Sequence, residues 1–405
     1  MRKGIFSILF CFLIYPFVTS AGSRDDFKTV TTSEPSYSEP QIMWGRNMWG
    51  KEGSKNGEFR GPSGIAVDSA GNIYVADTRN DRIQKFDRNG KFIAVLGSSG
   101  TGEGKLTNPG DVAVDADGNV YVVDTRNFRI QKFDIDGNYA ASWGPESEIG
   151  SGFIREPIGV AVDSAGTVYV ADAWQSLILK YDANGNFITA WGDPLNGSGG
   201  RFSFRPTYLA IDSSGNVFST DYYNNRVQKF DATGTLITTW GIQGSLAGEF
   251  SYPTGIAVDS SDNVFVVDTF NNRVQKFDNS GTFITEWGSA GDEYGFFNWP
   301  IGAAVNSSGK IYIADTLNNR IQIFNSSDKA CIVTSLLGET DPNINKIRNF
   351  RDTVLVKSVL GRQLIGLYYK TSGMFQPLLE KNPSAKKTTE IMLKSFLPVI
   401  DMIIQ

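Results

Sequence analysis

The stretch that decides the fold is GIAVDSAGNIYVADTRNDRIQKFD, which runs from Gly64 to Asp87. It recurs with small changes along the 405 residues of the chain. A proline just upstream marks the register of each copy, at Pro62, Pro109, Pro157, Pro206, Pro253 and Pro300. These prolines are 47 to 49 residues apart. Six copies at a nearly constant period indicate a repeat architecture.

Each copy has the pattern of β-strands rather than of helices. In the first copy we expect strands over 65–68, 73–77, 82–87 and 92–96. Turn-forming residues separate them, including the hairpin pair Asn89-Gly90. Four short strands per repeat predict one blade of a β-propeller. Stacking six blades around an axis buries the faces that a single blade would expose.

The spacing of tryptophans predicts how the ring closes. Trp143, Trp191, Trp240 and Trp287 each precede a glycine at the end of a fourth strand, where they can pack between blades. The sixth copy has three strands and ends near Phe324, whereas Trp49 lies 13 residues before Pro62, as Trp240 does before Pro253. We therefore expect residues 42–49 to supply the missing strand of the last blade, which removes two open edges.

The fold class predicted is all-β, a six-bladed β-propeller over residues 41–330, followed by a small helical region over 331–405. Residues 1–21 read as a secretory signal, with Arg2 and Lys3 before a short apolar run, and an uncleaved anchor is the alternative. Residues 22–40 are polar and read as a flexible linker. We therefore expect a secreted or extracytoplasmic protein.

Composition excludes several kinds of site. The chain has no histidine, which removes Ser–His–Asp and Cys–His catalysis and every histidine metal site. Its cysteines are Cys11 and Cys331, and loss of the first with the signal leaves no intrachain disulfide. The net charge of −5 argues against nucleic acid as a main partner. We expect a monomeric propeller.

The repeats resemble a known family. The pattern PxGIAVDxxGNVYVxDTxNxRIQKFD, with WG at the fourth strand, is similar to NHL repeats over residues 41–330. That resemblance implies a six-bladed propeller in a family of mixed function, which includes binding modules, sensor domains and an amidating lyase. The tail resembles the CFI-box module at residues 330–338 and 349–372, with Ile332 in place of the usual phenylalanine. This implies a bacterial or archaeal envelope protein.

Every second strand ends in an aspartate, and in five copies an arginine follows five residues later. The aspartates are Asp77, Asp124, Asp172, Asp221, Asp268 and Asp315, and the arginines are Arg82, Arg129, Arg226, Arg273 and Arg320. We expect a structural role, in which the aspartate caps a turn and pairs with arginine, rather than a ring of metal ligands. DADGN at 115–119 and DIDGN at 134–138 resemble calcium loops but lack the closing glutamate, so they predict hairpin turns.

The positions where the copies differ are the candidate site. Around the ring, the tips of the loops between second and third strands are Arg79, Arg126, Trp174, Tyr223, Phe270 and Leu317. Exposed aromatic side chains beside arginines are typical of binding surfaces. Asp111 and Tyr208 replace a glycine at the start of the innermost strand, and we expect both near the mouth of the channel. In the third copy Asp172 lacks the repeat arginine, which fits either a site or decay of the repeat.

Three functions remain open from the sequence. The first is an extracytoplasmic module that binds protein, peptide or glycan through the loop tips, with no catalytic residue and no cofactor. The second is a propeller enzyme, a lyase or a lactonase-like hydrolase, with an all-oxygen Ca²⁺ site. The third is an architectural role in which the C-terminal helices dock on a membrane or a partner.

Overall fold

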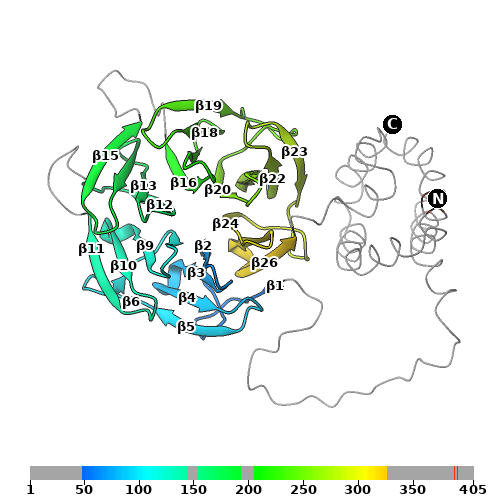
Figure 1. Ribbon diagram of the computed structural model, residues 1–405. Helices are drawn as coiled ribbons and strands as arrows, with labels where there is room; N and C mark the ends of the chain where they lie inside the picture. The colour runs from blue at the N-terminus through cyan, green and yellow to red at the C-terminus, as the bar shows by residue number, and fades with distance from the viewer. Residues whose placement is uncertain (1–47, 145–152, 193–204, 326–386, 388–389, 391–405) are drawn as a thin grey trace, which may run out of the picture. The chain divides into compact units, whose positions relative to one another are not determined.

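The computed structural model describes residues 48–144, 153–192 and 205–325, together with residues 387 and 390. Six four-stranded antiparallel sheets surround a common axis, so the predicted six-bladed propeller is confirmed (Figure 1). Blade 1 consists of β2 (Pro62–Val67), β3 (Ile73–Asp77), β4 (Arg82–Phe86) and β5 (Phe92–Leu96). In this blade and the next four, the strands run in chain order from the axis to the rim (Figure 1).

The other blades repeat this arrangement. Blade 2 has β8 (Val112–Val114), β9 (Val120–Asp124), β10 (Arg129–Phe133) and β11 (Tyr139–Trp143), and blade 3 has β12 (Pro157–Val162), β13 (Val168–Asp172), β14 (Leu177–Tyr181) and β15 (Phe187–Gly192). Blade 4 has β16 (Pro206–Ile211), β17 (Val217–Asp221), β18 (Arg226–Phe230) and β19 (Leu236–Trp240). Blade 5 has β20 (Pro253–Val258), β21 (Val264–Asp268), β22 (Arg273–Phe277) and β23 (Phe283–Trp287).

Blade 6 closes the ring with a strand from the other end of the propeller. It has β24 (Pro300–Val305), β25 (Lys310–Asp315), β26 (Arg320–Asn325) and, at its outer edge, β1 (Met48–Trp49). In the antiparallel register Met48 lies opposite Gln322 and Trp49 opposite Ile321. The prediction that the N-terminal strand belongs to the last blade is therefore confirmed for residues 48–49, and residues 42–47 of the expected strand lie outside the described residues.

Tryptophans and buried second strands join the blades. Each WG tryptophan among the described residues contacts an aromatic ring of the next blade, with ring centroids 5.6 to 6.4 Å apart in the pairs Trp49–Phe86, Trp143–Tyr181, Trp191–Phe230, Trp240–Phe277 and Trp287–Phe324. All five residues of β3 are buried, as are those of β9, β13, β17 and β21. The core therefore lies between blades, and its aromatic pairs add to the burial of apolar area.

The predicted signal, the linker and the helical CFI-box-like tail lie outside the described residues. Among the residues that are described, no helix has the length and the apolar character needed to cross a membrane.

Candidate binding surface on the loop face

Two kinds of connection distinguish the two ends of the propeller. At one end, here called the loop face, the loops between second and third strands lie beside those that lead from one blade to the next. Backbone hydrogen bonds join the two sets, as from Arg79 N to Arg60 O at 3.1 Å and from Phe270 N to Ser251 O at 3.1 Å. The other end, the turn face, carries the tight turns between first and second and between third and fourth strands. The loop tips predicted as a site are therefore neighbours of the blade-to-blade loops.

A buried carboxylate fixes these loops in each blade. Asp77, at the end of β3, accepts hydrogen bonds from Arg60 N at 2.8 Å and from Arg82 Nε at 2.8 Å. Asn80 and Gln84 also donate to it, and Arg82 donates to two carbonyls of the preceding loop. Equivalent arginine pairs join Asp124, Asp221, Asp268 and Asp315 to Arg129, Arg226, Arg273 and Arg320. The aspartates thus have the predicted structural role, with an arginine of the same blade as partner.

Blade 3 keeps the carboxylate without the arginine. Asp172 accepts from Arg155 N at 2.6 Å, from Gln175 N at 3.0 Å and from Gln175 Nε2 at 2.9 Å. Leu177, which stands where the other blades have arginine, is buried. The side chain of Gln175 therefore donates a hydrogen bond to Asp172 in place of the repeat arginine. The loss of the arginine leaves the loop scaffold of this blade in place.

Aromatic side chains form a continuous, partly exposed row across blades 4 to 6, which we call the aromatic arc: Tyr222, Tyr223, Tyr252, Phe270 and Trp299. Tyr252 contacts Tyr222 and Tyr223 at centroid distances of 5.0 and 6.2 Å. Phe270 lies 4.4 Å from Tyr252 and 4.2 Å from Trp299. Tyr223, Phe270 and Trp299 are 41%, 40% and 38% exposed. A row of contacting aromatic rings open to solvent is typical of a binding surface.

Two members of the arc have an unusual backbone conformation. Tyr252 and Trp299, each just before the proline of its blade, have φ of 53° and 55°. Gly61 and Asn108 occupy the same position in blades 1 and 2. A left-handed conformation costs a bulky residue about 1 to 2 kcal/mol, and such strain clusters at functional sites. Sequence reasoning missed both rings because it compared the loop tips and the starts of the innermost strands but not the residue before each repeat proline, which was the available signal.

The backbone that holds these two rings is clamped by the preceding blade. Tyr252 N donates to Asn225 Oδ1 and Trp299 N to Asn272 Oδ1, both at 2.8 Å. Each asparagine is the left-handed residue that ends the loop after a second strand. The backbone of these two residues is therefore held in place, which lowers the conformational entropy lost when a ligand binds to their rings.

Arginines and aromatic rings meet between the arc and blade 3. The guanidinium carbon of Arg155 lies 3.9 Å from the ring centroid of Trp174, which is 48% exposed. That of Arg205 lies 4.7 Å from the ring centroid of Tyr223, and Arg205 also pairs with Glu156 at 3.1 Å. These cation–π contacts orient the two rings and extend the surface from blade 4 to blade 3.

The remaining predicted tips are exposed, whereas the two inner-strand residues are buried. Arg79 and Arg126 are exposed in blades 1 and 2, and Leu317 is 46% exposed in blade 6. Asp111 and Tyr208 are only 4% and 7% exposed. Tyr208 Oη donates across two blades to Gly110 O at 3.3 Å. These two side chains therefore pack around the axis and do not form part of the exposed surface.

Burial dominates the electrostatics of this axial pair. Desolvation raises the pKa of Asp111 to about 8, although backbone N–H groups of Val160 and Val112 oppose the shift by donating to its carboxylate. Desolvation also raises the pKa of Tyr208 well above its usual value, and the charge of Asp111 adds to that shift. Asp111 is therefore largely a neutral carboxylic acid at pH 7.

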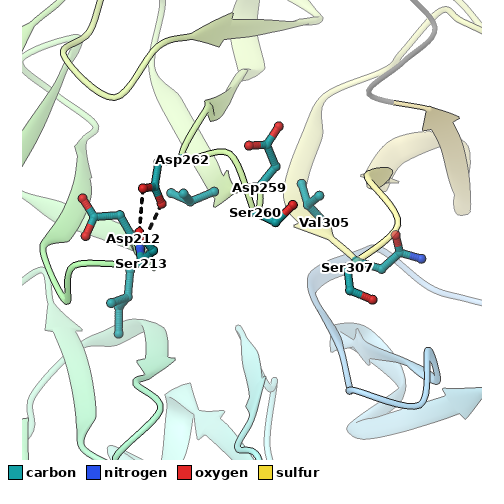
Figure 2. Close-up of a pocket in the computed structure, with 10 residues that line it drawn as sticks. Asp212, Ser213, Asp259, Ser260, Asp262, Val305 and Ser307 are labelled. Atoms are coloured by element: carbon teal, nitrogen blue, oxygen red, sulfur yellow. Dashed lines mark hydrogen bonds between the residues drawn. The ribbon is translucent and has the colours of Figure 1, made fainter.

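The turn face has a cavity of about 280 Å³, lined by the ends of β16, β20 and β24 and by the turns that follow (Figure 2). Its acidic side chains have partners within the fold. Asp212 accepts from its own turn and pairs with Lys229 at 3.1 Å, and Asp262 accepts from Ser213 N at 2.9 Å and Ser213 Oγ at 2.7 Å (Figure 2). In the described ranges, no three acidic or cysteine side chains are grouped closely enough to hold a metal ion.

The two segments that resemble calcium loops also lie at the turn face, as tight turns. Asn119 N donates to Asp115 Oδ1 and Asn138 N to Asp134 Oδ1, both at 2.8 Å. The carboxylates thus cap their own turns, as the sequence predicted.

Fold and surface together define a six-bladed propeller with a divergent loop face. Four of the six blades match the NHL repeat model, over residues 59–86, 106–133, 250–277 and 297–324, which correspond to blades 1, 2, 5 and 6. Within the aromatic arc, Tyr252, Phe270 and Trp299 lie inside the last two matched segments, whereas Tyr222 and Tyr223 lie in blade 4, outside the matched segments.

Curated relatives share only short stretches with the chain. It is 44% identical over 73 residues to the B-box type zinc finger protein ncl-1 of Caenorhabditis elegans, which covers 18% of this chain and 9% of that protein. It is 52% identical over 46 residues to protein lin-41 of the same organism, which covers 11% and 4%. The chain therefore spans less than a tenth of the length of these relatives.

Solved structures share the propeller at low identity. A Bacteroides thetaiotaomicron protein of unknown function has a TM-score of 0.56 at 18% identity, over 68% of this chain and 74% of that one. An auxiliary nutrient binding protein of the same organism has a TM-score of 0.51 at 14% identity, over 65% and 69%. A gluconolactonase from Xanthomonas campestris has a TM-score of 0.50 at 13% identity, over 66% and 86%. These likenesses concern the fold alone.

Proposed function

We propose that this propeller is an extracytoplasmic binding module that holds a protein, peptide or glycan ligand on its loop face. The observation that carries the proposal is the aromatic arc, in which Tyr252, Phe270 and Trp299 contact one another in series while remaining partly exposed. Rings held in this way offer large contact area at low entropic cost. The signal-like N-terminus supports a location outside the cytoplasm.

The strain at Tyr252 and Trp299 supports the same function. Gly61 shows that a glycine fits this position of the repeat, and it would relieve the left-handed conformation. The chain nevertheless carries bulky rings at two of these positions, where they contact Phe270. Packing against a ligand would explain why the rings are present at positions where glycine would remove the backbone strain.

The test is a binding screen of the purified full chain on peptide and glycan arrays, followed by variants. We expect the double substitution Tyr252→Gly and Trp299→Gly to weaken binding of any array ligand at least about tenfold, because burying each ring is worth more than 1.4 kcal/mol. Ile237→Ala, at an exposed apolar residue of the rim strand β19, should leave binding unchanged. Equal binding by the double variant and the wild type would refute the proposal.

A further inference from the structure

The loop face carries two sets of arginines with different surroundings. The repeat arginines, such as Arg82, are mostly shielded from solvent and pair with the buried aspartates. Arg60, Arg79 and Arg126 are instead exposed at the loop face of blades 1 and 2. Among the described residues, no acidic side chain lies within ion-pair distance of these three. We call Arg60, Arg79 and Arg126 the arginine sector.

The acidic residue in the same loop as Arg79 already has partners. Asp81 Oδ1 accepts from Asn108 N at 2.7 Å, and Asp81 Oδ2 accepts from Ser99 Oγ at 2.8 Å. The carboxylate therefore fixes the junction between blades 1 and 2 and leaves the arginine sector with unused donors. Each guanidinium presents a planar fork that matches a carboxylate with two parallel hydrogen bonds.

The ring geometry of the arc favours inserted side chains over stacked flat rings. Adjacent planes are tilted by 42° in the Tyr252–Phe270 pair and by 50° in the Phe270–Trp299 pair, at centroid distances of 4.4 and 4.2 Å. Each ring thus covers part of its neighbour. Guanidinium groups lie over Trp174 and Tyr223 as well. The surface therefore presents tilted apolar rings, against which the branched and aromatic side chains of a peptide can pack.

We propose that the ligand of the loop face is an acidic peptide segment, whose carboxylates bind the arginine sector while its apolar side chains pack on the aromatic arc. This inference rests on the proposed binding function and specifies its ligand. The order of the blades sets the pattern: charge over blades 1 and 2, mixed arginine–aromatic pairs over blades 3 and 4, and apolar contact over blades 4 to 6. A segment that carries both chemistries matches the whole surface.

The experiment compares two fluorescent pools of short peptides, one rich in Asp, Glu, Phe, Trp and Leu, and one with Asn and Gln in place of the acids. Full-length protein should bind the acidic pool at least about tenfold more tightly, because hydrogen bonds from arginine to a carboxylate are stronger than those to a neutral amide. Arg79→Gln with Arg126→Gln should remove that preference. Arg88→Gln with Lys91→Gln, an equal change of charge in the β4–β5 turn at the other face, should keep it.

The outcomes separate this inference from the proposed function. If the Tyr252→Gly and Trp299→Gly variant loses binding but the Arg79→Gln and Arg126→Gln variant does not, the proposed binding function stands. The inference of an acidic ligand is then overturned. Loss in neither variant would overturn both. Tighter binding of a heparin oligosaccharide or of oligothymidylate than of the acidic pool would also overturn the acidic peptide.

Discussion

Aspartates of the loop face bind residues of other segments, whereas aspartates of the turn face bind residues of their own turn. At the loop face, Asp268 is fully buried and accepts from Arg273 Nε at 2.7 Å and from Ser251 N at 2.7 Å, which ties two loops to one blade. At the turn face, Asp163 accepts from Ala165 N and Thr167 N of its own turn. The loop face thus has a uniform buried layer beneath a surface that differs between blades, whereas the turn face repeats one local motif. Because the buried aspartate recurs in every blade while the side chains above it differ, the surface of the loop face can vary to suit a ligand without loss of the layer beneath it.

The largest effect is expected when the buried layer is broken. Asp268→Ala removes a buried ion pair with Arg273 and the acceptor of hydrogen bonds from Ser251 N and from the side chains of Asn271 and Gln275, although Glu286 still pairs with Arg273. We expect the free energy of unfolding to fall by about 3 to 5 kcal/mol, measured by urea denaturation. The turn-face counterpart Asp163→Ala removes local hydrogen bonds and should cost only about 1 kcal/mol.

Two further substitutions control this comparison. Asp172→Ala acts in the blade without the repeat arginine, so it should cost less than Asp268→Ala. Asp163→Asn should be close to neutral, because Asn306 fills that position in blade 6 and accepts from Ser308 N and Lys310 N. Equal costs for Asp268→Ala and Asp163→Ala would contradict the difference drawn between the two faces.

The second prediction uses pH to distinguish the buried carboxyl at the axis from the carboxylates of the turn face. Burial raises the pKa of Asp111 to about 8, so the folded state binds its proton more tightly than the unfolded state. Stability should therefore fall as the pH rises from about 4 to 8, by up to about 1.4 kcal/mol per pH unit. Asp111→Asn should remove this loss, measured as the difference in free energy of unfolding between pH 5 and pH 7.

Carboxylates of the turn face have the opposite effect on the pH dependence of stability, because their pKa values are lowered in the folded state. Hydrogen bonds from the side chain and backbone of Asn138 lower the pKa of Asp134, and those of Asn186 do so for Asp182. Their stabilisation is present above the unfolded pKa and is lost as the pH falls through the folded value. If wild type and Asp111→Asn show the same slope between pH 5 and pH 7, the axial carboxyl is not the source of the loss.

The repeat made the fold predictable, and it also limited what could be predicted of the site. The proline register and the position of Trp49 sufficed for six blades and their closure. The tips Trp174, Tyr223 and Phe270 were found as differences between copies, and all three are exposed. This worked because a repeat aligns equivalent positions and so identifies the loop that each tip occupies.

Other features depend on contacts between blades, which the pattern within a blade does not reveal. The left-handed backbone of Trp299 is clamped by Asn272, 27 residues earlier and in the previous blade. The burial of Asp111 follows from close packing of the inner strands, since a Cβ placed on Gly64 would lie 2.2 Å from Asp111 Oδ1. Both require knowledge of which atoms of one blade approach the next.

The smallest effect on stability is expected at the surface where function is expected to change most. Trp299→Gly removes the contact with Phe270 but also relieves a left-handed conformation that glycine adopts without steric cost. The two effects are each about 1 kcal/mol and opposite in sign, so the free energy of unfolding should stay within about 0.5 kcal/mol of wild type. Urea denaturation at neutral pH measures the change.

Trp287→Ala provides the contrast within the same blade boundary. Trp287, the last residue of β23, packs between the rings of Phe265 in blade 5 and Phe324 in blade 6, so its truncation should cost about 3 to 5 kcal/mol. A loss of several kcal/mol in Trp299→Gly would show that the arc contributes to holding blades 5 and 6 together. If Trp299→Gly leaves the free energy of unfolding nearly unchanged but abolishes ligand binding, Trp299 serves recognition, because glycine at this position gives the same stability.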